Sequence, residues 1–456
     1  MRLIFDHGTL VLLEAPERRF ELIPGFLWDP RIALWRAPAW RYAEAVAALR
    51  EHGLPLVDEV VSGAGAAPAG FCEIGLRPYQ RAAALAWESA DRRGLVVLPT
   101  GSGKTRVALA LIAAQRVRTL CLVPTRALLA QWIGELEAVH GGPIGCLGDG
   151  RQLLEPITVA TFESAYRYMP RIGNQFELVV VDEVHHFGAN VRDEALEMCT
   201  APLRLGLTAT PPGEPALTRL RALIGPVVYA LGVGDLSGSY LAEFELVVVP
   251  LGLDREERAR YAAEQRAFTE VRRAFRRVHP ESTWQEFVAF AAQSPEGRAA
   301  LAAWRRARKL LGFTRAKAAA LRVLLARHRH DKVIVFTADN AAAYAIAREQ
   351  LIMPVTCDVS RRERERALEA FRSGALRALV SARVLNEGID VPDAEVAVIV
   401  AGTLGQREHV QRVGRLLRPA PGKRAVVYEL VTMATSEAWQ AAERRRGLAA
   451  THVVPA

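Results

Sequence analysis

The chain has 456 residues, half of them hydrophobic and 24% charged, with a formal net charge of +9. This length is too great for one hydrophobic core and fits two or three domains. No stretch reaches the roughly 18 unbroken apolar residues of a membrane span, and residues 1–20 lack the layout of a signal peptide. We therefore expect a cytoplasmic protein with no membrane partner. The five cysteines are scattered and form no CxxC pair, so they give no support for a zinc or iron–sulfur site.

The positive charge is concentrated in one segment. Residues 255–330 hold 18 lysines and arginines against 7 acids, an excess larger than that of the whole chain. A high pI favours a polyanionic partner, although many basic proteins bind none. Nearly all basic residues are arginines, for which a GC-rich genome is sufficient reason, and this bias makes Lys104 conspicuous.

Residues 1–62 alternate short apolar runs with Pro and Gly and include one helical stretch at 42–52, which predicts a small α+β domain. A segment of linker composition follows at 62–70. From 71 to 240 apolar strands alternate with helical patterns, and the same alternation returns at 331–431. This pattern indicates parallel sheets with helices on both faces, so the fold class is α/β with two such domains in tandem.

A long arginine-rich helical segment, residues 255–312, separates the two α/β patterns. Tyr261, Phe268 and Phe275 recur in it every seven residues and therefore share one helix face. We interpret that face as the core seam of a helical hairpin, in preference to a platform on which nucleic-acid bases stack.

The segment LVVLPTGSGKT, residues 95–105, has the pattern of a phosphate-binding loop between a buried strand and a helix. Gly101 and Gly103 let backbone N–H groups turn toward a phosphate, and the helix N-terminus adds the positive end of its dipole. Lys104 is expected to reach the β and γ phosphates of ATP, and the Thr105 hydroxyl to hold Mg²⁺. Leu98 stands where the strict pattern has Gly or Ala, so an accidental Gly-rich turn is the alternative.

A second buried strand, LVVVDEVHH at residues 178–186, ends in two acids. Asp182 can coordinate Mg²⁺, usually through water, and Glu183 can polarise the attacking water. On its own, a strand that ends in acids is as often an ordinary surface turn. Together with the phosphate-binding loop it predicts an ATPase that uses ATP and Mg²⁺.

These two motifs and QRVGRLLR at 411–418 make the chain resemble the helicases of superfamily 2 over residues 71–431. The resemblance implies two RecA-like domains. It assigns ATP binding, beyond the loop residues already named, to Arg77, Gln80, Thr100, Ser102, Gly388 and Asp390. It assigns catalysis to Gln411, Arg415 and Arg418, nucleic-acid contacts to Thr125, Arg126, Thr161 and Thr337, and coupling of hydrolysis to movement to Thr208, Ala209 and Thr210. A helical arginine pair such as Arg415 and Arg418 is, by itself, typical of a solvated face.

A narrower resemblance, to the XPB family in its short archaeal or bacterial form, covers nearly the whole chain. It is carried by residues 1–62, the DEVHHF variant, the helical insert and the segment NEGIDVP. It implies a damage-recognition-like domain at 1–62, RecA-like domains at 71–240 and 241–456, and a thumb-like insert at 255–312. The arginines of the insert, Arg272, Arg273 and Arg276 among them, suit contact with DNA phosphates. ATP-driven 3′-to-5′ movement, duplex opening, a role in DNA repair and a partner nuclease or repair complex are implied by the family alone.

One departure from the family bears on strand separation. The family has an Arg-Glu-Asp triplet shortly after its TAT motif, whereas this chain reads TATPPGEPALTRL, in which Glu214 is the single acid. Three alternatives to a strand-separating DNA helicase therefore stay open. They are a translocase that moves on duplex DNA without parting it, a DNA-binding scaffold with an inactive ATP site, and an enzyme that acts on RNA.

Overall fold

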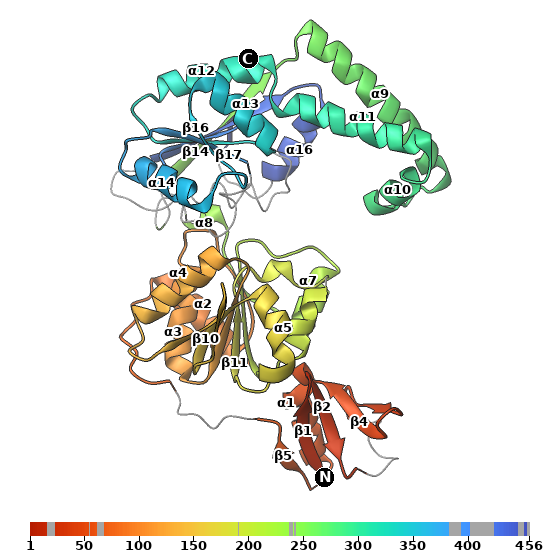
Figure 1. Ribbon diagram of the computed structural model, residues 1–456, viewed down its shortest axis with the longest axis vertical. Helices are drawn as coiled ribbons and strands as arrows, with labels where there is room; N and C mark the ends of the chain where they lie inside the picture. The colour runs from red at the N-terminus through yellow and green to blue at the C-terminus, as the bar shows by residue number, and fades with distance from the viewer. Residues whose placement is uncertain are drawn as a thin grey trace. The chain divides into compact units, whose positions relative to one another are not determined.

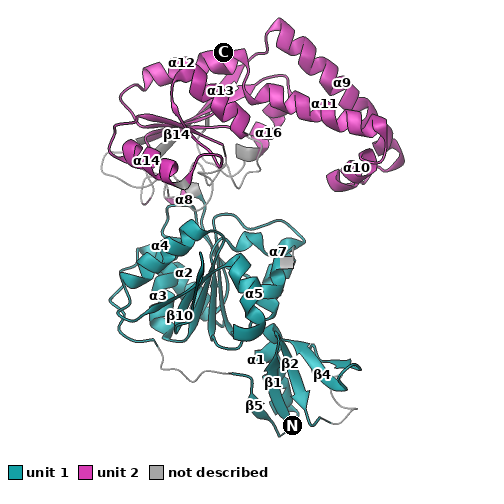
Figure 2. Cartoon of the chain, in the orientation of Figure 1, with its two compact units in different colours: residues 1–232 teal, residues 233–456 magenta. Residues whose placement is uncertain are grey.

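A computed structural model describes residues 1–15, 23–53, 55–61, 68–189, 191–236, 240, 243–382, 394–401, 424–445 and 451–453. The chain divides into two compact units, residues 1–232 and 233–456, called unit 1 and unit 2 (Figure 2). Among the described residues, no helix combines the length and hydrophobicity that crossing a bilayer requires.

Unit 1 begins with a small mixed sheet. Its strands are β1 (Arg2–Asp6), β2 (Thr9–Leu13), β3 (Leu27–Asp29), β4 (Leu34–Pro38) and β5 (Val57–Glu59), in the order β3-β4-β2-β1-β5. Neighbours are antiparallel except β1 and β5. A 3₁₀ turn, η1 (Ala39–Arg41), leads into α1 (Tyr42–Glu51), which buries Val46 and Leu49 against Leu3 and Trp35 of the sheet. The predicted α+β character of this segment is confirmed.

The main sheet of unit 1 has eight strands in the order β13-β6-β12-β11-β7-β10-β8-β9. They are β6 (Arg93–Val97), β7 (Thr119–Val123), β8 (Ile144–Gly148), β9 (Arg151–Leu153), β10 (Ile157–Thr161), β11 (Leu178–Val181), β12 (Leu203–Thr208) and β13 (Val227–Ala230). Every pair is parallel except β8 and β9. Strands β7, β8, β10 and β11 are buried at every residue, as expected where helices cover both faces.

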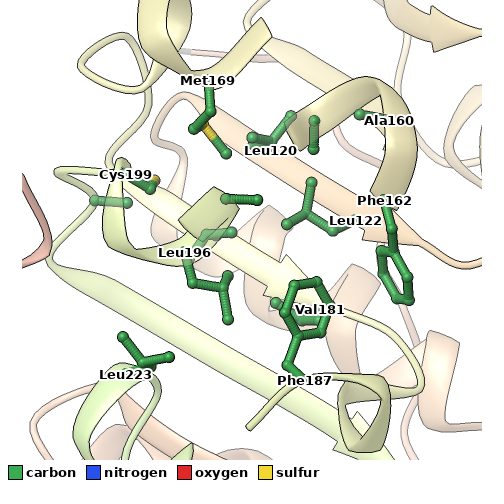
Figure 3. Packing of buried hydrophobic residues seen from close by; sticks show 14 of the residues in the cluster. Leu120, Leu122, Ala160, Phe162, Met169, Val181, Phe187, Leu196, Cys199 and Leu223 are labelled. Atoms are coloured by element: carbon green, nitrogen blue, oxygen red, sulfur yellow. The ribbon is translucent and has the colours of Figure 1, made fainter. Parts of the chain in front are cut away.

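Helices lie around this sheet, as Figure 1 shows. They are α2 (Pro78–Ser89), α3 (Lys104–Gln115), α4 (Arg126–Glu137), α5 (Phe162–Ile172), α6 (Glu194–Glu197) and α7 (Ala216–Leu223), with 3₁₀ turns η2 (Val184–His186) and η3 (Val191–Asp193). Side chains from several of them meet the sheet in one hydrophobic cluster, in which Leu122, Phe162, Val181, Phe187 and Leu196 pack together (Figure 3).

A fully buried arginine ties part of this core together. The guanidinium of Arg204, on β12, donates hydrogen bonds to the backbone carbonyls of Leu196, Cys199, Ala201 and Leu223. Burial lowers the pKa of Arg204 to about 10. Since its guanidinium donates to four carbonyls, Arg204 joins α6 and α7 to the sheet.

Unit 2 holds a second sheet, in the order β16-β17-β15-β18-β19-β14-β20, with every pair parallel. Its strands are β14 (Glu243–Leu251), β15 (Val333–Phe336), β16 (Met353–Val355), β17 (Ala378–Ser381), β18 (Val396–Ile399), β19 (Arg424–Thr432) and β20 (Thr451–Val453). The described residues of unit 2 outside the insert form helices α8 (Val233–Leu236), α12 (Arg315–Arg327), α13 (Asn340–Gln350), α14 (Arg361–Arg372) and α16 (Ser436–Arg445). The sequence pattern did not predict β14, which the insert separates from the rest of the sheet.

The insert consists of α9 (Arg255–Val278), α10 (Trp284–Ala291) and α11 (Pro295–Gly312). Helices α9 and α11 run side by side, and α10 lies at their far end (Figure 1). Phe268 and Phe275 are buried against Phe287 and Leu301, while Tyr261 is buried near the base against Leu311. The interpretation of the aromatic face as the core of a helical hairpin is confirmed.

The base of the insert is attached to α16 by buried polar contacts. Lys317 Nζ is completely buried and donates to both carboxylate oxygens of Glu437, at 2.7 and 2.8 Å, and to the carbonyl of Leu311 at 2.8 Å. The hydroxyl of Tyr261 accepts a hydrogen bond from the backbone N–H of Ser436 at 3.0 Å. Both long helices of the insert are therefore held at the beginning of α16.

Candidate nucleotide site and nucleic-acid interface

Apart from Arg77 and Gln80, which lie at the start of α2, the predicted motifs of unit 1 follow the carboxyl ends of parallel strands. The phosphate-binding loop follows β6, the TAT motif ends β12, and the two acids follow β11. Thr125 follows β7 and Thr161 ends β10. Since the strand order is β6-β12-β11-β7-β10, the three nucleotide motifs lie together on one edge, and the two nucleic-acid segments lie next to them. Parallel α/β sheets place their ligand sites at this edge.

The phosphate-binding loop has the backbone that its glycines require. Gly101 and Gly103 have φ angles of 82° and 80°, in the left-handed region, and Gly103 caps α3. A Cβ on Gly103 would lie 2.5 Å from Gln80 Nε2. The Lys104 ammonium lies 3.3 Å from the carbonyl oxygen of Leu98. The loop therefore presents a cation and a helix N-terminus, the two features that bind phosphate.

Side chains of α2 also hold the loop in place. Tyr79 Oη and Gln80 Nε2 both donate to the carbonyl of Ser102, at 2.6 and 2.8 Å. Gln80 Oε1 accepts from the backbone N–H of Arg77 at 2.9 Å. Each polar group of the Gln80 amide thus has one partner in the protein, and the amide keeps a second N–H and a second lone pair with which adenine could bond. Ser102 itself is buried, and its hydroxyl donates to the carbonyl of Pro99.

The two acids after β11 are both strongly desolvated but differ in their neighbours. Burial raises the pKa of Asp182, and the charge of Glu183 raises it further, while Lys104 opposes both effects. Burial also acts to raise the pKa of Glu183, but the contact with His185 and the charge of Lys104 outweigh it, so this pKa is lowered. The contact with His185 and the charge of Lys104 thus favour the charged form of Glu183, and Asp182 is the carboxyl whose charge a bound cation would stabilise most.

A histidine links the acids to the TAT motif. His185 Nδ1 lies 3.2 Å from Glu183 Oε2 and 3.0 Å from Thr208 Oγ1. Thr208 Oγ1 also accepts from the backbone N–H of Thr210 at 3.2 Å. Ala209, between them, is buried. The motif LVVVDEVHH contains His185, but its pattern predicts no role for this residue.

The residues at this edge fit a magnesium ion that accompanies a nucleotide. Thr105 lies in the first turn of α3 and Asp182 directly follows β11, and hydroxyl and carboxylate oxygens are the ligand types that Mg²⁺ prefers. The hydroxyls of Thr100 and Thr210 are buried and have no hydrogen-bond partner among the residues that the structure describes, so they are available to a ligand or its water. Within the described part of the chain, no three His, Cys, Asp or Glu side chains form a metal cluster. The remaining ligands would come from phosphates and water.

The predicted nucleic-acid residues occupy different settings. Thr125 and Thr161 cap α4 and α5, and their hydroxyls accept from the N–H groups of Leu128 and Ser164 at 3.2 Å. Arg126 is exposed and lies 3.4 Å from Asp149. In unit 2, Thr337 follows β15 and is fully buried, and its hydroxyl has no hydrogen-bond partner within the described ranges.

The three arginines singled out on α9 also differ from one another. Arg272 lies over the rings of Phe268 and Trp284, at 5.7 and 5.5 Å from their centroids. Arg273 lines a cavity of about 710 Å³ together with Arg258 and Arg266. Arg276 is exposed. Arg273 and Arg276 are thus open to a polyanion, whereas Arg272 is partly used for packing.

Five of the predicted site residues lie outside the described part of the chain: Gly388, Asp390, Gln411, Arg415 and Arg418. Glu214, the acid after the TAT motif, is described. Its carboxylate accepts from the backbone N–H and the hydroxyl of Thr218, at 3.0 and 2.6 Å, and lies 3.3 Å from Arg221. These contacts of Glu214 therefore stabilise the beginning of α7.

Three family models match the sequence. They are the Xeroderma pigmentosum group B helicase damage recognition domain over residues 3–60, the Type III restriction enzyme res subunit over 73–213, and the helicase conserved C-terminal domain over 316–420. The chain is 34% identical over 425 residues to the DNA 3′-5′ translocase XPB2 of Sulfurisphaera tokodaii, which covers 93% of this chain and 96% of that protein. The chain belongs to the XPB family. The similarity places it among the ATP-dependent DNA 3′-5′ helicases and translocases, as the resemblance implied.

A bacterial member of the XPB family matches as well. The DNA 3′-5′ helicase XPB of Mycobacterium tuberculosis is 31% identical over 389 residues, which are 82% of this chain and 64% of that protein. Among solved structures, the Pyrococcus furiosus Hef helicase domain superposes with a TM-score of 0.53 at 18% identity, covering 81% of this chain and 98% of that one. Together with the sheet topology, this similarity confirms the predicted fold class, two RecA-like sheets with a small N-terminal domain and a helical insert.

Proposed function

We propose that the edge of the unit 1 sheet binds ATP with Mg²⁺ and hydrolyses it. In this proposal Arg77, Gln80 and residues 100–105 hold the nucleotide. Thr105 and Asp182 hold Mg²⁺, Lys104 binds the phosphates, and Glu183 polarises the attacking water. The single observation that supports this most strongly is the convergence of loop, acids and TAT motif on three adjacent strands. Mg²⁺ itself would neutralise charge that develops on the phosphates.

Residues beyond this edge complete the proposal by family resemblance. Gly388 and Asp390 would bind ATP, and Gln411, Arg415 and Arg418 would act at the γ phosphate. Thr208 to Thr210 would couple hydrolysis to movement. We further propose the domain limits 1–62, 71–240 and 241–456, with the insert at 255–312.

We propose that the protein binds DNA and moves along it. The N-termini of α4 and α5 adjoin the nucleotide motifs, and helix N-termini suit backbone phosphates. Arg126, Thr125 and Thr161 are proposed to make such contacts in unit 1, and Thr337, Arg272, Arg273 and Arg276 in unit 2. The arginine excess of the insert supports a backbone grip that weakens as salt rises.

Two modes of action remain as candidates, strand separation and movement on duplex DNA without separation. The second is favoured by one observation, since Glu214, the single acid near the position of the family triplet, is engaged by Thr218 and Arg221. A forked-duplex unwinding assay beside a triplex-displacement assay distinguishes them. Unwinding supports the helicase, and triplex displacement without unwinding supports the translocase.

The ATPase proposal is tested by measuring hydrolysis with and without duplex DNA and with duplex and single-stranded RNA. Stimulation by DNA and loss of activity in Lys104→Ala are expected. Hydrolysis that no DNA stimulates would contradict the proposal, and activity that persists in Lys104→Ala would show that another site is responsible. A role in repair with a partner nuclease is proposed from the family alone, and a pull-down that recovers no stable partner would count against it.

A further inference from the structure

The side chain of Trp132, on α4, reaches the candidate magnesium site. Trp132 is completely buried, and its indole nitrogen donates to Oδ2 of Asp182 at 2.9 Å. The other carboxylate oxygen, Oδ1, accepts from the backbone N–H of Glu183, also at 2.9 Å. Each oxygen of Asp182 therefore has one fixed donor, and the plane of the carboxylate is set by the protein. The sequence pattern assigned no role to Trp132.

Trp132 belongs to the helix whose first turn carries the proposed DNA contacts. Thr125 caps α4 and Arg126 opens it, so Trp132 lies about 10 Å further along the helix axis at 1.5 Å per residue. On the same buried face, Leu129 lies beside Gly148, whose other neighbour is Thr161, the cap of α5. One rigid helix thus touches the nucleic-acid side of the sheet edge and the nucleotide side.

A second buried tryptophan in unit 1 shows the ordinary solution for an indole donor. Trp87 is also completely buried, and its indole nitrogen donates at 2.9 Å to the backbone carbonyl of Arg204. A carbonyl is the usual partner, since buried polar groups need one and most side-chain hydrogen bonds go to the backbone or to water. Trp132 instead donates to a desolvated carboxylate at the site, where a fixed partner orients a metal ligand.

We infer that Trp132 is a positioning residue that orients Asp182 toward Mg²⁺, and that through it α4 couples DNA bound at Thr125 and Arg126 to the Mg²⁺–nucleotide site. The inference rests on the proposed function, in which Asp182 holds Mg²⁺. Loss of an outer partner of a metal ligand typically lowers metal affinity by about 10-fold to 100-fold. The coupling must be reciprocal, so DNA should tighten Mg²⁺–nucleotide binding by the same factor that the nucleotide tightens DNA binding.

The test uses the full chain and a fluorescent ADP, whose affinity is measured in Mg²⁺ and in EDTA. In the wild type, Mg²⁺ tightens binding. In Trp132→Phe we expect this Mg²⁺-dependent gain to fall at least about tenfold, with the affinity in EDTA unchanged. Trp87→Phe is the matched control, because it removes an indole N–H hydrogen bond of the same length, 2.9 Å, at an equally buried position of the same unit. It should keep the wild-type gain.

Two further measurements make the test decisive. Trp132→benzothienylalanine replaces the indole N–H by sulfur while preserving the ring shape, and it should show the same loss. It takes the place of Trp132→Phe if that variant does not fold stably. Adding a duplex oligonucleotide should tighten Mg²⁺–ADP binding in the wild type and in Trp87→Phe. In Trp132→Phe the duplex should still bind but without this effect.

The outcomes are distinguishable. If the ADP affinity of the wild type is the same in Mg²⁺ and in EDTA, both the proposed function and this inference are overturned. A wild type that responds to Mg²⁺, beside a Trp132→Phe variant that responds equally, would overturn the inference alone. Equal losses in the Trp87 and Trp132 variants would also overturn it, because they would mark a general packing effect.

Discussion

The ring of His185 contacts the hydroxyl of Thr208, with His185 Nδ1 3.0 Å from Thr208 Oγ1. The same nitrogen is 3.2 Å from Glu183 Oε2. Since the Thr208 hydroxyl donates to the carbonyl of Thr210 at 2.9 Å, it accepts from His185, which assigns the ring proton to Nδ1. One imidazole therefore joins the proposed catalytic glutamate to the motif proposed to couple hydrolysis to movement.

His185→Ala is expected to lower DNA-stimulated ATP hydrolysis by about twofold to tenfold, since it removes the hydrogen bond to the Thr208 hydroxyl and a neutral hydrogen bond contributes about 0.5–1.5 kcal/mol. His185→Asn should retain more activity, because its amide N–H₂ can donate from nearly the position of Nδ1. Both are compared by kcat with and without duplex DNA, with melting temperature as the control for folding. Identical kcat values in the two variants would show that the donor is unimportant.

Gly103→Ala should abolish nucleotide binding. The φ of 80° disfavours any side chain. The new Cβ would also lie 2.5 Å from Gln80 Nε2, which donates to the carbonyl of Ser102 in the loop. Gly134→Ala is the control, because Gly134 is an exposed position of α4 with no atom within 4 Å of a built Cβ. That change should stabilise the protein by about 0.5–1 kcal/mol. Fluorescent ATP binding and thermal melting measure the two effects, and normal binding by Gly103→Ala would refute the loop geometry.

Lys317→Met should destabilise unit 2 by about 3–5 kcal/mol, because it leaves the Glu437 carboxylate buried without its cation. Adding Glu437→Gln should recover much of that loss, since the amide is uncharged and its oxygen can still accept from the N–H of Thr432. Urea unfolding of the two single variants and the double variant measures the coupling energy. Additive losses would mean that the two side chains do not interact in solution.

His140 provides a pH-dependent test of stability. Burial lowers its pKa, and its ring lies 4.6 Å from that of Phe71, centroid to centroid. The folded chain therefore binds fewer protons than the unfolded chain below about pH 6.5, and stability should fall as the pH drops from that value toward the lowered pKa. His140→Phe should reduce the fall in melting temperature between pH 7 and 5, whereas changing the exposed His52 to Gln should leave it as it is. An unchanged fall in His140→Phe would contradict the assignment.

Much of the fold and the centre of the site could be predicted because they depend on local sequence. A glycine-rich turn between strand and helix, or an apolar strand ending in Asp182 and Glu183, is written in consecutive residues. The contacts that hold these groups in place are made by residues far apart in the sequence. Trp132 and Asp182 are 50 residues apart, and a tryptophan on the apolar face of a helix has the same pattern whether its N–H meets a carbonyl or a catalytic carboxylate.

The same limit applies in unit 2. Strand β14 was missed because its partners, β19 and β20, lie beyond the insert in the sequence, and parallel pairing leaves no turn signal between neighbours. Lys317 belongs to an arginine-rich segment that suggests a solvated surface, yet it meets Glu437 at a separation of 120 residues. Nothing local distinguishes this buried lysine from its exposed neighbours.

The insert has its own aromatic core around Phe268 and Phe275, and its base is fixed separately through Tyr261 and Lys317. Evolution could therefore lengthen, shorten or recharge the far end of the insert while the sheet of unit 2 stays intact. The base has no such freedom. Related motors that differ in the DNA they grip should vary most around α10 and least where α9 and α11 meet α16.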